Sequence, residues 1–268
     1  MRQDGVIVVR GGGDIATGVI QKFYRCGFRL LVLETDKPAA IRRSAALCET
    51  VYTGVATVED VTCELISALP EMDKSYMCGV VPMIIDPCGE SIARLKPAAV
   101  IDAIMAKRNL GTHKGMASVT IGLGPGFYAS DDVHAVIETM RGHDLGRLIL
   151  RGNARTNTGI PGEVGGESAR RVIYAPVGGE IRHFKKIGDI LEAGETICAV
   201  SGESVMTPFR GLLRGLIHEG LYVLKGMKIA DMDPRIDIDW RTISDKARCV
   251  GGAALEAYLY LSNTMYMK

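Results

Sequence analysis

The sequence has no excess of charge of either sign, because 32 basic and 31 acidic residues are spread over 268 positions. Such a balance creates no overall field that would attract nucleic acid or an anionic membrane. The sequence also lacks an apolar run of 18 or more residues and an N-terminal signal-peptide pattern, so it predicts neither a transmembrane helix nor a leader. These absences favour a cytoplasmic protein whose partners include neither nucleic acid nor a membrane.

Cysteine and histidine are present without the spacing that disulfide or zinc sites need. The seven cysteines are odd in number, scattered, and include no C-x-x-C pair, which indicates reduced thiols that act mostly as small core residues. No H-x-x-x-H pattern occurs, so no metal site is predicted. Asp36, Asp86 and Asp102 could gather around a divalent cation at one sheet edge, but aspartates at strand ends also cap helices and turns.

The strongest pattern in the sequence is an apolar run that meets three glycines and then a segment with helical spacing. Gly11, Gly13 and Ala16 fit G-x-G-x-x-G/A, and a second apolar run ends in Glu34. This order is typical of a Rossmann-type unit, whose glycine turn brings a phosphate to a helix N-terminus and whose acid, roughly 20 residues later, binds a ribose. The stretch therefore predicts a nucleotide site.

Further residues are candidates to complete this site. The carboxylate of Asp14 can cap the helix, but it lies where a diphosphate would bind, so the ligand need not be ordinary NAD. The loop of residues 122–127, GLGPGF, can cradle an anion or form a tight corner of a β-domain. The predicted cofactor-binding residues are Arg10, Gly11, Gly12, Gly13, Asp14, Glu34, Arg42, Arg43, Asp86, Gly124 and Gly126.

Strand and helix patterns alternate from residue 1 to about residue 110 and predict an α/β fold with a Rossmann-like parallel sheet. Residues 111–240 have the short alternating runs and glycine turns of a β-rich domain. A last helix within 241–268, from Asp245 to about Leu261, is expected to return and cover the first sheet. The other expected elements are helices over 40–50, from Thr57 to Leu69 and over 91–95, strands over 51–53, 78–86 and 98–105, a hairpin of 133–140 with 145–150, and a functional loop over 153–167.

Residues 172–234 contain two similar halves, 175–200 and 205–232, each with a strand, a glycine turn and another strand. This module resembles the barrel-sandwich hybrid of biotinyl and lipoyl domains. Those domains carry a modified lysine at the tip of a hairpin, whereas the equivalent turn here, Ser201–Ser204, has none. The difference disfavours a swinging-arm carrier and favours a rigid scaffold or docking surface.

Several separated blocks together resemble the YqeB family, proteins of the selenium-dependent molybdenum hydroxylase system. The blocks are VRGGGDIATGVIQKFYRCGF, ETDKPAAIRRSAA, VIDAIMAKRNLGT, IGLGPGF, HAVIETMRGHDLGR, NTGIPG and MTPFRGLLRGLIHEG. The resemblance implies an accessory protein in hydroxylase maturation that handles a nucleotide-bearing cofactor or precursor, either NAD-like or a molybdopterin dinucleotide. It also implies a hydroxylase or another maturation protein as partner, leaves a homo-oligomer open, and supplies no catalytic residue.

Two other functions remain as alternatives. An NAD(P)-dependent oxidoreductase would use His113 or His143 as general acid or base, whereas His134 alternates with apolar residues and is expected to be structural. A selenium carrier would use the thiolate of Cys88, which precedes a predicted helix.

Overall fold

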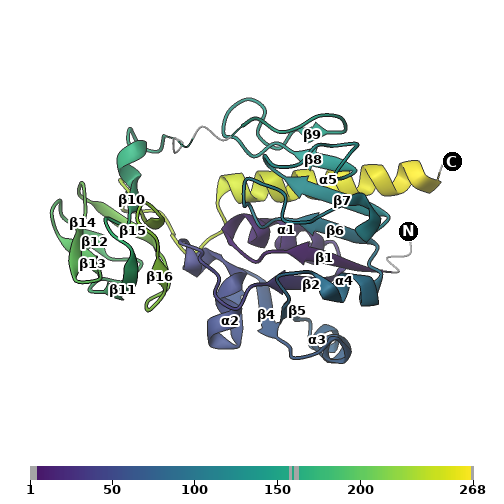
Figure 1. The fold of residues 1–268 in the computed structure, drawn as a ribbon, viewed down its shortest axis with the longest axis horizontal. Helices are drawn as coiled ribbons and strands as arrows, with labels where there is room; N and C mark the ends of the chain where they lie inside the picture. Colours follow the sequence, from purple (N-terminus) through teal and green to yellow (C-terminus); the bar gives the residue numbers. More distant parts are fainter. Residues whose placement is uncertain (1–4, 157–158, 160–162, 267–268) are drawn as a thin grey trace. The chain divides into compact units, whose positions relative to one another are not determined.

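The computed structural model describes residues 5–156, 159 and 163–266 (Figure 1). The chain divides into two compact units. The first contains residues 1–38, 46–157 and 243–268, and the second contains residues 39–45 and 158–242. Among the described residues, none of the helices has the length and apolarity needed to cross a membrane.

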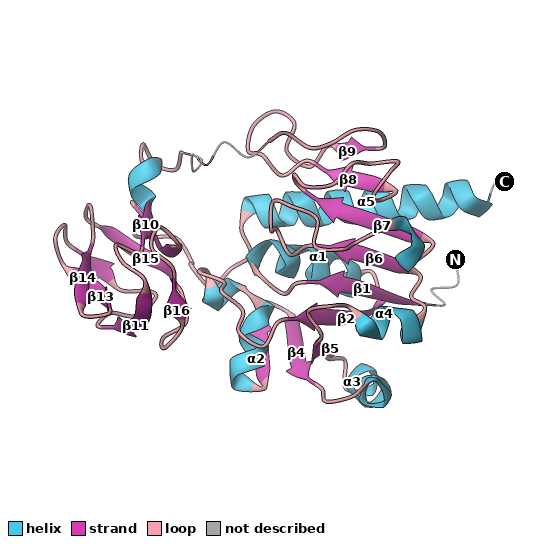
Figure 2. Ribbon diagram, in the orientation of Figure 1, coloured by secondary structure: helices cyan, strands magenta, loops and turns pink. Residues whose placement is uncertain are grey.

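The first unit is built on one sheet of nine strands within the described residues, in the order β3-β4-β5-β2-β1-β6-β7-β8-β9 (Figure 2). Neighbouring strands from β4 to β8 pair in parallel, and only the two edge pairs are antiparallel. Apolar side chains fill the strand interiors because helices and loops cover both faces of a parallel sheet. The strands are β1 Val6–Arg10, β2 Arg29–Glu34, β3 Val55–Val58, β4 Val61–Leu65, β5 Val81–Ile85, β6 Ala99–Asp102, β7 Val119–Leu123, β8 Ala135–Ile137 and β9 Leu148–Ile149.

Two long helices pack side by side against this sheet, and glycines allow their close approach. A Cβ atom on Gly18 would lie 2.3 Å from the carbonyl oxygen of Ala247. The ring centroids of Phe23 and Tyr258 lie 5.8 Å apart. The first contact joins the early parts of the two helices, and the second joins positions later in both. The helices therefore run parallel, and their N-termini lie at the same edge of the sheet. This confirms the expected return of the last helix. The helices of the unit are α1 Asp14–Arg25, α2 Thr50–Thr53, α3 Met72–Met77, α4 Glu90–Leu95 and α5 Asp245–Tyr266.

The second unit consists of two antiparallel four-stranded sheets among the described residues, β10-β17-β15-β12 and β14-β13-β11-β16. Ile181, Val200 and Leu213 are buried in one apolar core, and Val200 pairs with Glu203 across a tight turn without lysine. The resemblance to a barrel-sandwich hybrid stays a prediction. The strands are β10 Val172–Tyr174, β11 Gly179–His183, β12 Ile190–Leu191, β13 Thr196–Val200, β14 Glu203–Met206, β15 Gly211–Leu216, β16 Tyr222–Val223 and β17 Lys228–Asp233.

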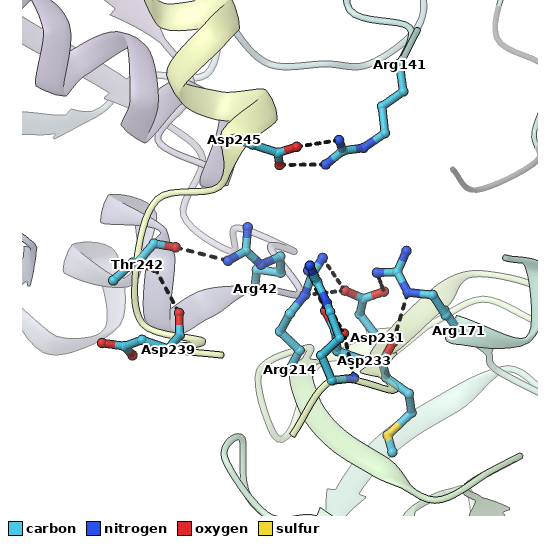
Figure 3. A network of polar contacts seen from close by, with 11 residues as sticks. Arg42, Arg141, Arg171, Arg214, Asp231, Asp233, Asp239, Thr242 and Asp245 are labelled. Atoms are coloured by element: carbon cyan, nitrogen blue, oxygen red, sulfur yellow. Dashed lines mark hydrogen bonds and ion pairs between the residues drawn. The ribbon is translucent and has the colours of Figure 1, made fainter. Parts of the chain in front are cut away.

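Two buried carboxylates of β17 hold the first of these sheets together (Figure 3). Arg214 of β15 contacts Asp231 at 2.8 Å and Asp233 at 3.0 Å, so its guanidinium bridges both acids. Arg171, just before β10, also contacts Asp231, and Arg235 contacts Asp233. Buried charges are tolerated only when they are paired and hydrogen-bonded, and this network pairs both carboxylates with guanidinium groups.

Three predicted elements between residues 40 and 69 are wrong. Residues 40–50 form 3₁₀ turns, Arg43–Ala45 and Leu47–Glu49, and the expected strand over 51–53 is helix α2. The expected helix after Thr57 is the hairpin β3–β4, in which the hydroxyls of Thr57 and Thr62 lie 2.9 Å apart. The β-branched residues of this stretch favour a strand, and that preference overrides the capping-box pattern.

The first sheet also extends beyond the expected boundary at residue 110. Strands β7, β8 and β9 belong to it, and the first unit continues to residue 157. The alternation of strand and helix stops in the sequence because residues 103–118 connect β6 to β7 through a loop with only one 3₁₀ turn, Lys114–Met116. Helix α5, from the end of the chain, packs against β7, β8 and β9.

Candidate functional site

The order of the parallel strands marks one place in the first unit as the expected ligand site. Strand β1 lies between β2 and β6, and the order β5-β2-β1-β6-β7-β8 is that of a dinucleotide-binding fold. The chain moves to one side of β1 through β2 and β5 and then returns to the other side at β6. Ligands of open α/β sheets bind outside the carboxyl ends of the strands at such a switch point. Here those ends are Arg10 of β1 and Asp102 of β6.

The three predicted glycines occupy this point and have different roles. Gly11 has φ of +95°, and a Cβ there would lie 3.1 Å from the carbonyl oxygen of Ala103. A Cβ on the buried Gly12 would lie 2.9 Å from the end of the Met83 side chain. Gly13 has φ of −64°, and no atom lies within 4 Å of the place its Cβ would take. Packing therefore requires the first two glycines, whereas the third leaves open space at the start of α1.

Glu34 lies next to the glycine turn, as the sequence predicted. Its carboxylate accepts hydrogen bonds from the backbone N–H of Gly12 at 2.7 Å and from that of Thr35 at 2.8 Å. Burial raises the pKa of Glu34, and the two amide bonds oppose this rise without cancelling it. In the part of the chain that the structure describes, the N–H of Gly13 has no hydrogen-bond acceptor, so it remains a donor at the helix N-terminus.

A lysine that the sequence reasoning missed also lies near the turn. Lys246, in the first turn of α5, is half-buried; burial lowers the pKa of Lys246, and the nearby carboxylate of Asp14 opposes this fall. Asp14 also accepts a hydrogen bond from the backbone N–H of Ile15 at 3.0 Å. The N-cap residue of α1 is Gly13, and it has no side-chain capping bond, so the expected capping by Asp14 is wrong. The sequence did offer one indication of Lys246, because it lies in the first turn of the helix that was expected to return to this sheet.

Arg10 is placed at the switch point, but its guanidinium has other partners than the expected phosphate. Only 2% of Arg10 is exposed, and its Nη1 donates to the Thr112 hydroxyl at 2.5 Å. That hydroxyl donates in turn to the Asp102 carboxylate at 2.6 Å, and the Arg10 Nη2 donates to the Pro87 carbonyl at 3.2 Å. Arg10 therefore fastens the loops after β5 and β6 to β1.

The aspartates at the strand ends serve turns and helices. Asp86 accepts the N–H groups of Gly89 and Ser91 at 2.8 and 2.7 Å; burial acts to raise the pKa of Asp86, but these bonds outweigh it and lower the value. Asp36 is exposed and contacts the Thr35 hydroxyl. Within the described ranges, no group of three or more metal-binding side chains occurs.

The remaining predicted ligands are not brought to the turn by contacts within the first unit. Arg42 and Arg43 belong to the second unit, where they donate to the carbonyls of Thr242 and Leu216. These contacts leave their predicted phosphate role without support.

The GLGPGF loop is packed as a corner. Gly124 has φ of +77°, and a Cβ there would lie 2.5 Å from the Thr139 hydroxyl oxygen. Gly126 has φ of +112°, and a Cβ there would lie 2.7 Å from the Cα of Arg108. The positive φ and the close neighbours, the Thr139 side chain for Gly124 and the Arg108 backbone for Gly126, therefore account for both glycines.

The residues of the alternative functions lie on loops of the first unit. His113, His143 and Cys88 are exposed. His134 accepts the Thr120 N–H on Nδ1 at 3.0 Å, as expected for a structural histidine. Part of the predicted functional loop, residues 157–158 and 160–162, lies outside the described residues.

Comparison with known proteins gives one close relative. The chain is 46% identical over 257 residues, or 96% of its length, to "Uncharacterized protein YqeB" of Escherichia coli (strain K12), which supports the resemblance to the YqeB family. The chain spans about half the length of that relative, 48%. No protein-family model matches the chain.

Two solved structures show only distant likeness. An aspartoacylase family protein from Mesorhizobium loti has a TM-score of 0.25 and 10% identity, covering 81% of this chain and 60% of that one. A succinylglutamate desuccinylase from Silicibacter sp. TM1040 has a TM-score of 0.25 and 9% identity, covering 85% of this chain and 84% of that one. With TM-scores this low, neither likeness bears on the fold or the function of this chain.

Proposed function

We propose that this chain is an accessory protein that binds a nucleotide-bearing molecule at the glycine turn after β1. The observation that carries the proposal is the position of this turn. It lies at the switch point of a parallel sheet with the strand order of dinucleotide-binding folds, and Glu34 is hydrogen-bonded beside it.

The residues around the turn fit a nucleotide in two respects. The open space at Gly13 and its N–H donor, at the start of the twelve-residue helix α1, suit a phosphate oxygen. The Glu34 carboxylate retains acceptor capacity beyond its two amide bonds, because an ionised carboxylate offers about four lone-pair sites. It can therefore accept a ribose hydroxyl. Lys246 supplies positive charge of the kind that the sequence analysis expected from Arg10, Arg42 or Arg43.

The role of this binding is inferred from the family resemblance. It points to the maturation of a selenium-dependent molybdenum hydroxylase, with a pterin dinucleotide or a precursor as the ligand and the hydroxylase or another maturation protein as partner. Binding and delivery need no nucleophile or general base. This agrees with the site as it is built. Glu34 accepts a hydrogen bond from the glycine turn, and Lys246 places a positive charge near it.

The test of binding is native mass spectrometry of protein purified from its own host, followed by denaturing release of small molecules. We expect a nucleotide or pterin-nucleotide species to leave the wild-type chain and to be absent from Gly13→Val. The Gly252→Ala variant is the matched control, because no atom lies within 4 Å of a Cβ at Gly252 in α5. Equal ligand content in wild type and Gly13→Val would contradict the site.

The test of the maturation role is made in cells. Deletion of the gene is expected to leave a molybdenum hydroxylase without its cofactor, and wild type but not Gly13→Val is expected to restore it. Full hydroxylase activity in the deletion strain would remove the role while leaving the binding site standing.

A further inference from the structure

The loop that follows β6 starts and ends against the end of β1. The Ala103 N–H donates to the Arg10 carbonyl at 2.9 Å, and the Cα of Ile104 lies 3.1 Å from the place of a Cβ on Gly11. The loop returns at Thr112, whose hydroxyl accepts from the Arg10 guanidinium. Both ends of the loop are therefore held at the carboxyl end of β1, and residues 105–111 lie between these two anchors.

The backbone of this loop is strained. Met105 and Lys107 have φ of +63° and +61°, a backbone conformation that residues other than glycine adopt only at an energetic cost. In the described chain this conformation occurs at six non-glycine residues, and only these two occur within three positions of each other. Such strain persists where surrounding contacts impose it, and it is concentrated at functional sites.

Contacts that impose this shape follow directly after the strained residues. The Asn109 side chain accepts the N–H of Thr112 at 2.8 Å and donates to its carbonyl at 2.8 Å. The Cα of Gly126 lies so close to Arg108 that a Cβ would be 2.7 Å from the Arg108 Cα. The backbone of Lys107 and Arg108 is therefore fixed before any ligand binds.

The side chains on this fixed backbone are two exposed cations. Among the residues that the structure describes, Lys107 and Arg108 form no ion pair and no side-chain hydrogen bond. Arg10, by contrast, is buried and bonded to Thr112 and Pro87. Lys107 and Arg108 therefore add positive charge on the β6 side of the switch point, in addition to that of Lys246 beside Asp14.

We propose that Lys107 and Arg108 bind the terminal anionic group of the ligand and determine its class. This rests on the proposed nucleotide site and deepens it. With Gly13 at the first phosphate, a second anion site on the β6 side of the switch point selects a nucleoside diphosphate, or a conjugate of one, over a nucleoside monophosphate. Arg binds phosphate in a bidentate manner and Lys as a point charge.

The test is isothermal titration calorimetry with four nucleoside diphosphates, ADP, CDP, GDP and UDP, and with the monophosphate of the tightest binder. For wild type, we expect the diphosphate to bind at least about tenfold more tightly than the monophosphate. In the double variant Lys107→Gln/Arg108→Gln, we expect the diphosphate affinity to fall about 10- to 100-fold, in line with charge-assisted hydrogen bonds. The monophosphate affinity should change by less than about twofold.

Lys96→Gln is the matched control. Lys96 is also an exposed lysine with positive φ, +49°, but it precedes β6 and so lies at the opposite end of that strand. Its substitution is expected to leave both affinities unchanged. Circular dichroism should show the same thermal midpoint for all variants, because the substituted side chains are exposed.

Three outcomes separate the two proposals. A diphosphate preference that the double variant loses supports the inference. A wild type that binds a diphosphate, with equal affinity in the double variant, overturns the role of Lys107 and Arg108 and leaves the nucleotide site intact. A wild type that binds none of the four diphosphates overturns both.

Discussion

The Glu34 carboxylate accepts a 2.7 Å hydrogen bond from the backbone N–H of Gly12. The acid at the end of β2 thus holds the glycine turn after β1 in shape, besides being placed to accept a ribose hydroxyl. Its partner Gly12 is tightly packed, because a Cβ there would lie 3.1 Å from the backbone nitrogen of Cys48 and 2.9 Å from the end of the Met83 side chain. The turn and the acid are therefore one structural unit, and changes to either should affect both stability and binding.

The Glu34→Gln variant should differ from wild type in how its free energy of unfolding depends on pH. Because burial raises the pKa of Glu34 in the folded state above the ordinary 4.5, the folded state binds the proton more readily than the unfolded state. Wild-type stability contributed by this group is therefore present at low pH and is lost as pH rises through the raised pKa. The variant, which cannot titrate, should gain stability relative to wild type over that window.

Urea unfolding at several pH values from about 4 to about 7 measures this difference. At low pH the variant should be less stable by about 1–2 kcal/mol, because a glutamine offers only one acceptor oxygen for the two N–H groups of Gly12 and Thr35. A stability difference that does not change with pH would show that Glu34 titrates normally.

The first and third glycines of the turn should respond to substitution in opposite ways. Gly11→Ala places a Cβ 3.1 Å from the Ala103 carbonyl at φ of +95° and should destabilise the fold by about 1–3 kcal/mol. A Cβ at Gly13 has no atom within 4 Å, so Gly13→Val should unfold within about 0.5 kcal/mol of wild type while losing nucleotide. Thermal unfolding followed by circular dichroism distinguishes them; a Gly13→Val protein as unstable as Gly11→Ala would show that the space there is not open.

Two adjacent glycines of α5 provide a test of its contact with α1. A Cβ on Gly251 would lie 2.3 Å from the Gly18 carbonyl oxygen, whereas one on Gly252 meets nothing within 4 Å. Gly251→Ala should destabilise the first unit by about 1–3 kcal/mol through overpacking. Gly252→Ala should stabilise it by about 0.5–1 kcal/mol through helix propensity. Denaturant unfolding checks both, and equal effects of the two substitutions would be inconsistent with the close contact.

Thr112→Val removes the hydroxyl between Arg10 and Asp102. The buried guanidinium and carboxylate then each lose a partner, which should cost about 1–3 kcal/mol. Hydrogen exchange of residues 103–112 should become faster, because this bond closes the loop onto β1. Thr112→Ser keeps the hydroxyl and should restore slow exchange; a valine variant with unchanged exchange would show that Asn109 alone holds the loop.

The local part of this architecture could be predicted from the sequence. The unit from β1 through α1 to β2, with Glu34 beside the turn, follows from apolar runs and glycine positions that lie within one short stretch. The return of α5 to the first sheet also followed from its apolar face. Both patterns can be recognised within a single short stretch of sequence.

The contacts that decide the use of each site residue join distant parts of the chain. Nothing in the sequence links Arg10 with Thr112, or Lys246 with Asp14. The phosphate role was therefore predicted for Arg10, Arg42 or Arg43, and the first of these is buried in a hydrogen-bond network. A loop connects β6 to β7, and the helix that packs there, α5, comes from the end of the chain. The sequence after residue 110 therefore has no helix pattern to indicate that the first sheet continues.

The most direct test of the nucleotide site is an NMR titration of the ¹⁵N-labelled chain with the nucleoside diphosphate that binds most tightly. The account predicts that the amide signals of Gly12, Gly13 and Asp14 shift with saturation, together with those of Lys107 and Arg108, and that Gly13→Val abolishes the shifts. Saturable shifts confined to other residues, with these five unchanged, would contradict it.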